Sequence, residues 1–156
     1  MGLDMYLSAK RFLWSFGEHS DVKLAEQIAA LFPELTPKKA YGKEVSRVKE
    51  VSVEAIYWRK SNAIHAWFVK NCQGGVDDCG NYRVEREELQ ELADLCKEVL
   101  ADHSKAAELP PAKDGFFFGS TDFDEWYFED LERTVQEIEQ VLTMPDAWEF
   151  EYHSSW

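Results

Sequence analysis

The sequence has few of the features that mark a secreted or membrane protein. Its 156 residues include only three cysteines, Cys72, Cys79 and Cys96, without the dense spacing of a disulfide framework, so reduced thiols are expected. Asp4 comes before any N-terminal apolar run, which argues against a signal peptide or a membrane span there. We therefore predict a cytoplasmic protein that contacts no membrane.

Basic residues are also scarce. The chain has 17 Lys and Arg against 30 Asp and Glu, a net charge of -13. Residues 121–151 hold eleven acids and a single base, Arg133, whereas residues 10–60 carry a local charge of +3. Such a surface repels nucleic acid over most of its area and attracts basic protein surfaces. Direct nucleic-acid binding is disfavoured, and a host protein with a basic surface is the predicted partner.

What the chain does contain is a pattern of strands and helices. Apolar alternation predicts strands over 3–12, 47–60, 82–84 and 148–152, the second half-buried for most of its length. Helical spacing predicts helices over 22–32, 62–73, 87–106 and 124–142. We predict one α+β domain, 1–156, with a mixed or antiparallel sheet of about four to five strands covered by about four helices.

The stretch GFFFGSTDFDEWYFED, residues 115–130, has two interpretations. It reads as a buried strand followed by a helix that Ser120, Thr121 or Asp122 caps. Alternatively, the backbone around Ser120 and Thr121 binds a ligand at the helix N-terminus. No Walker A lysine is present and nearby acids repel anions, so a nucleoside or amide suits this place better than a polyphosphate.

The block YWRKSNAIHAWFVKN ends a predicted strand and begins a helix, a common place for ligands. Arg59 and Lys60 would meet an anionic group, Asn62 would lie beside them, and His65 would transfer a proton. The plainer interpretation gives two solvated cations and a histidine satisfied at the edge of the core.

The segment NCQGGVDDCGNY lacks the spacing of a zinc or calcium site, so no metal and no cofactor are predicted. Cys79 with His65 as its base would form a nucleophilic pair. The neighbouring Asp77 and Asp78 would raise the pKa of that thiol, which counts against the pair.

The last predicted helix is strongly acidic. Its carboxylates form either a solvated face opposite the apolar stripe or a surface that binds a basic cleft, with aromatic anchors between them. The candidate interaction residues are Trp126, Tyr127, Glu129, Asp130, Glu132 and Glu137. The aromatic load, which includes Trp148 and Trp156, also predicts a homodimer.

The MGLDMYL start and the blocks YWRKSNAIHAWFVKN, VDDCGNYRV and GFFFGSTDFDEWYFEDL resemble a family of small uncharacterised proteins encoded by bacteriophages and prophages. The resemblance covers residues 1–7 and most of 54–142. It implies an accessory protein of the bacterial host cytoplasm and supplies no catalytic residue.

Three functional hypotheses follow. The first is a non-enzymatic, phage-type accessory protein that engages a host protein or sequesters a small ligand. The second is a small enzyme whose pocket joins Arg59, His65 and Ser120. The third is a structural component of a virion, for which the sequence offers no evidence.

Overall fold

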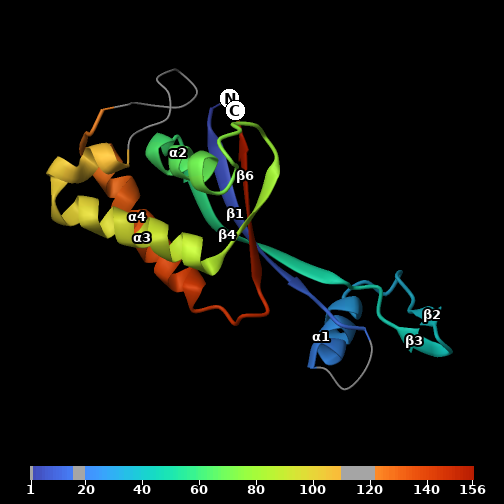
Figure 1. Ribbon diagram of the computed structural model, residues 1–156. Helices are drawn as coiled ribbons and strands as arrows, with labels where there is room; N and C mark the ends of the chain where they lie inside the picture. The colour runs from blue at the N-terminus through green and yellow to red at the C-terminus, as the bar shows by residue number, and fades with distance from the viewer. Residues whose placement is uncertain (1, 16–19, 110–121) are drawn as a thin grey trace. The chain divides into compact units, whose positions relative to one another are not determined.

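The computed structural model describes residues 2–15, 20–109 and 122–156 (Figure 1). The chain divides into two compact units. The main unit comprises Met1–Ala9 and Glu54–Trp156, and the smaller unit comprises Lys10–Val53. Two long strands, β1 (Asp4–Phe12) and β4 (Glu50–Arg59), contribute residues to both units.

The main unit is built on a four-stranded antiparallel sheet with the strand order β4-β1-β6-β5. Its other strands are β5 (Asn81–Val84) and β6 (Glu149–Ser155), which pair with Val84 opposite Phe150. The N- and C-termini lie side by side at one end of this sheet, because β1 and β6 are neighbours that run in opposite directions (Figure 1). The predicted α+β class is confirmed.

Helices of the main unit cover one face of the sheet (Figure 1). They are α2 (Asn62–Asn71), α3 (Arg86–Ala101), the 3₁₀ helix η1 (His103–Glu108) and α4 (Glu125–Leu142). Leu89 and Leu92 of α3 and Leu131 and Ile138 of α4 are buried, as their 3.6-residue spacing predicts. The inward residues of β1 pack against these helices; they are Met5, Leu7 and Ala9. Half-buried residues alternate with them along the strand.

The ends of the helices differ from the sequence-based expectation. Asp124 caps α4, because its carboxylate accepts a hydrogen bond from the backbone N–H of Tyr127 at 3.0 Å. The prediction that Ser120, Thr121 or Asp122 caps this helix is therefore wrong. Ser61 precedes α2 as predicted, but its side chain makes no capping hydrogen bond.

Strand β4 is less buried than its alternation predicts. Ile56 and Trp58 are buried, whereas Glu50 and residues 52–54 are exposed, so the prediction of a strand half-buried for most of its length is wrong. Burial begins only where β4 enters the main unit, because the core of that unit supplies the apolar partners. Alternation reports which residues share a face but not whether that face is covered.

The smaller unit contains α1 (Ser20–Ala29) and a hairpin of β2 (Lys38–Ala40) and β3 (Lys43–Val45) that the sequence analysis did not predict. Tyr41 and Gly42 join the two strands with φ values of 50° and 75°. Positive φ at both central positions is typical of a type I′ turn, where Asn-Gly is the usual pair. Tyr41 is 94% exposed, so burial of its ring does not offset the energetic cost of its positive φ.

Candidate binding site

A pocket of about 520 Å³ in the main unit joins two of the regions singled out in the sequence. One wall is formed by the connection between β4 and α2, residues 59–63, and includes Arg59, Lys60 and Asn62. The other wall is formed by the N-terminal half of α4 and the acids that precede it. We call this cavity the mixed-charge pocket because its walls carry opposite charges.

Polar contacts, among them a fully buried hydrogen bond, hold the two walls together. The indole Nε1 of Trp58 in β4 donates to the hydroxyl of Thr134 in α4 at 2.9 Å, and that hydroxyl donates to the backbone carbonyl of Asp130 at 2.6 Å. Arg133 donates to the carbonyl of Tyr57 at 3.1 Å and to the Asp130 carboxylate at 2.9 Å. Since Trp58 and Thr134 are both 0% exposed, these contacts fix α4 against the end of β4.

The basic wall is a tight turn. Lys60 has a φ of 56°, in the left-handed region that side chains other than glycine rarely adopt. Its N–H donates to the carbonyl of Leu3 at 2.8 Å, and its carbonyl accepts from Asn62 at 2.9 Å, so both ends of the strained residue are fixed. Strained residues cluster at functional sites. Arg59 is largely exposed beside it, 3.9 Å from the Asp4 carboxylate.

The acidic wall surrounds an exposed aromatic ring. Trp126 is 76% exposed, and the carboxylates of Asp122, Asp124 and Glu129 line the same pocket. Its neighbour Tyr127 is only 8% exposed and donates to the carbonyl of Leu109 at 3.0 Å. Burial raises the pKa of Tyr127 to about 12. Tyr127 therefore anchors α4, while Trp126 presents its ring to the pocket.

Not every predicted site residue belongs to this pocket. Glu132 and Glu137 of the acidic helix are not among its lining residues. Ser120 and Thr121, with the predicted strand at 116–118, lie outside the described residues. Asp122 and Asp124 were considered only as helix-capping residues or as charges that repel an anionic ligand, and Arg133 was not proposed as a site residue. The opposite charges on the two sides of the cavity come together only in three dimensions.

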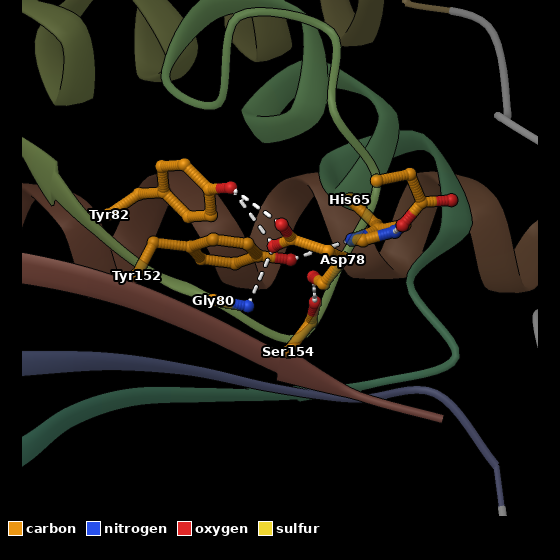
Figure 2. Close-up of polar contacts among 7 residues, drawn as sticks. His65, Asp78, Gly80, Tyr82, Tyr152 and Ser154 are labelled. Carbon is orange, nitrogen blue, oxygen red and sulfur yellow. Dashed lines mark hydrogen bonds and ion pairs between the residues drawn. The ribbon is translucent and has the colours of Figure 1, made fainter.

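His65 lies apart from the pocket, in a buried polar network (Figure 2). Its side chain is 0% exposed; Nδ1 is 2.8 Å from the Tyr152 hydroxyl and Nε2 is 3.1 Å from the Asp77 carboxylate. A carboxylate oxygen accepts hydrogen bonds, so Nε2 donates to Asp77, and Nδ1 has the Tyr152 hydroxyl as its partner. Burial raises the pKa of Tyr152, which keeps its hydroxyl protonated.

A second set of contacts stabilises the loop beside this network (Figure 2). One carboxylate, Asp78, accepts from the backbone N–H of Gly80 at 2.7 Å and from the Tyr82 hydroxyl at 3.0 Å. Ser154 donates to the carbonyl of Asp78 at 3.5 Å. Because the aspartates of this loop are engaged with protein groups, the arrangement resembles a structural loop anchor more than a site open to substrate.

The thiols offer little reactivity. Burial raises the pKa of Cys96, and likewise that of Cys72, to about 12, so both are protonated at neutral pH. Cys79 is exposed, but His65, its hypothetical base, is enclosed between Asp77 and Tyr152. Within residues 2–15, 20–109 and 122–156, no group of three or more His, Cys, Asp or Glu side chains is placed to hold a metal ion.

Comparisons with family models, curated proteins and solved structures found no match to this chain. None of the helices in the described ranges is long and apolar enough to cross a membrane. The geometry of the pocket therefore carries the functional argument.

Proposed function

We propose that this chain is a non-enzymatic, phage-type accessory binding protein that engages a basic segment of a host protein in the mixed-charge pocket. The observation that carries the proposal is the exposed ring of Trp126 in a pocket that Asp122, Asp124 and Glu129 also line. A Lys or Arg side chain over an indole face is attracted by the ring and by the neighbouring carboxylates together.

The basic wall gives the bound segment a direction. Arg59 and Lys60 stand across the pocket from the carboxylates, so they attract an acidic side chain or a carboxylate next to the cation. A segment that carries both charges in the matching order is favoured, and one in the reverse order is repelled at both ends.

A second candidate is a small zwitterionic ligand. The cavity volume of about 520 Å³ lies in the range of small-molecule sites, and its two walls would receive a cationic and an anionic group of one molecule. The enclosed position of His65 gives such a ligand no general acid or base, which favours sequestration over turnover.

The test uses a short fluorescein-labelled peptide of alternating arginine and glycine and the full chain at two salt concentrations. We expect Trp126→Ala to raise the dissociation constant about three- to thirtyfold, which corresponds to the loss of a cation–π contact. Glu129→Lys should raise the dissociation constant by a similar factor.

Glu132→Lys is the matched control, because Glu132 is exposed on the same helix but does not line the pocket. It should change the affinity by less than about twofold at moderate salt. If Glu129→Lys and Glu132→Lys reduce the affinity equally, peptide binding depends only on the net charge of the helix, and the proposed site is wrong. Native mass spectrometry of protein purified from a bacterial lysate distinguishes the small zwitterionic ligand from the peptide. The small ligand predicts a retained adduct of a few hundred daltons.

A further inference from the structure

The hairpin of β2 and β3 in the smaller unit presents charged side chains and an aromatic ring to solvent. Its four charged residues and the tyrosine of its turn are all exposed: Lys38, Lys39, Lys43, Glu44 and Tyr41. Tyr41 combines 94% exposure with a φ of 50°, and strained residues cluster at functional sites. The hairpin is therefore a basic segment with one acid and an aromatic tip.

The register of the hairpin divides its charges between two faces. Residues directly opposite each other in an antiparallel pair share a face, and successive residues of a strand alternate between faces. Lys39 lies opposite Glu44, whereas Lys38 lies opposite Val45. Val45 is only 4% exposed, so its face is covered by the smaller unit. The opposite face, which we call the Lys39–Glu44 face, carries a cation and an anion side by side.

The Lys39–Glu44 face matches the two walls of the mixed-charge pocket. The acidic wall around Trp126 attracts the ammonium group of Lys39. The basic wall at Arg59 attracts the carboxylate of Glu44. We propose that the β2–β3 hairpin of one copy of this chain binds in the mixed-charge pocket of a second copy, an inference that rests on the proposed binding function of this pocket and names its partner.

The distribution of charge favours this contact over others between two copies. The smaller unit has a net charge of +2, with eight basic and six acidic residues, and the rest of the chain has -15. Two whole chains repel each other, but at physiological ionic strength exposed charges more than about 8 Å apart are largely screened. The charges at the contact therefore decide, and they are opposite in sign.

The hairpin and the pocket are different surfaces, so the contact between them is heterologous. Two copies that exchange hairpins form a closed dimer, and copies that each bind the next form an open row. A basic host segment uses the same pocket as the hairpin, so the two compete. The arginine–glycine peptide should therefore dissociate the assembly.

Sedimentation velocity of the full chain at micromolar to submillimolar concentrations measures the association. We expect a mass that rises with concentration, and Lys39→Glu should weaken the association about tenfold or more, because a carboxylate then faces the acidic wall. Lys38→Glu is the matched control, since it makes the same change of charge on the other face of the hairpin. It should change the association by less than about threefold at moderate salt.

A mixture of two variants tests the pairing directly. Glu129→Lys should weaken the association as Lys39→Glu does, because it reverses a charge of the acidic wall. In the mixture, the introduced glutamate of one variant faces the introduced lysine of the other, and the reciprocal contact joins two unaltered surfaces. The equimolar mixture should therefore associate under conditions in which each variant alone stays monomeric.

A chain that is monomeric at every concentration overturns the inference. Equal losses from Lys38→Glu and Lys39→Glu, or a mixture that does not associate, overturn it as well. Failure of the pocket itself gives a different result: Lys39→Glu leaves the pocket unaltered, so it should bind the arginine–glycine peptide within about twofold of the unaltered chain. Peptide binding without association leaves the proposed function standing, whereas association that needs Lys39 and Glu129 in a chain that binds no peptide assigns the pocket to a second copy alone.

Discussion

Replacement of Tyr152 by phenylalanine tests whether the His65 network is structural. The variant removes only the hydroxyl that lies 2.8 Å from Nδ1 of His65, and both side chains are 0% exposed. The ring stays, so its stacking on Phe68, with centroids 4.0 Å apart, is kept and no large cavity forms. Leaving a buried nitrogen without its hydrogen-bond partner should lower the free energy of unfolding by about 1–3 kcal/mol.

Tyr82→Phe is the control for this prediction. The Tyr82 hydroxyl donates to the Asp78 carboxylate in a solvent-exposed place, so we expect a loss of less than about 1 kcal/mol. Urea unfolding is followed by tryptophan fluorescence in a Trp14→Phe background, because the other tryptophans all belong to the main unit. A loss of about 2 kcal/mol moves the midpoint by roughly 1 M. If Tyr152→Phe is no more destabilising than Tyr82→Phe, the network does not stabilise the fold as argued.

Three further predictions concern single groups. Burial raises the pKa of the Cys96 thiol from about 9 to about 12, so between these pH values its contribution to the unfolding free energy falls with rising pH by up to about 1.4 kcal/mol per pH unit. In urea melts, Cys96→Ala should therefore show a correspondingly shallower alkaline decline. Tyr41→Asn should stabilise the hairpin by about 1 kcal/mol, seen as slower amide exchange in β2 and β3, and faster exchange would contradict the strain argument. Lys60→Gly should raise the unfolding midpoint while weakening binding of acid-containing peptides, and an unchanged midpoint would mean that Lys60 is not strained.

The local pattern of the sequence was sufficient to predict most elements of the main unit. The apolar spacing of α3 and the alternation in β6 place most of their buried residues correctly, because each pattern depends only on neighbours within a few residues. In α4 the predicted stripe is only partly right, because Leu131 and Ile138 are buried whereas Phe128, Val135 and Leu142 are half-buried. The hairpin at Tyr41-Gly42 escaped prediction because tyrosine is an unusual residue at its positive φ. The cap at Asp124 was missed because several adjacent residues are chemically able to cap.

The candidate site shows where local information ends. Arg59, Lys60 and Asn62 were singled out as a ligand site and Trp126, Glu129 and Asp130 as a separate interaction surface, yet one pocket contains them all. His65 was grouped with the first set, but it points into the core toward Tyr152, 87 residues away in the chain.

By itself, the sequence determined the uneven charge of this protein, the amphipathic helices and the alternating strands, because these depend on residue type and short spacing. Only the tertiary structure decided that the acidic helix faces the turn at Lys60 and that Phe32 and Leu35 line a groove with residues 47–52. Such contacts depend on hydrogen bonds and packing between residues that are far apart in the sequence. Trp58, for example, donates to Thr134, 76 residues away, and no local sequence pattern predicts that pairing.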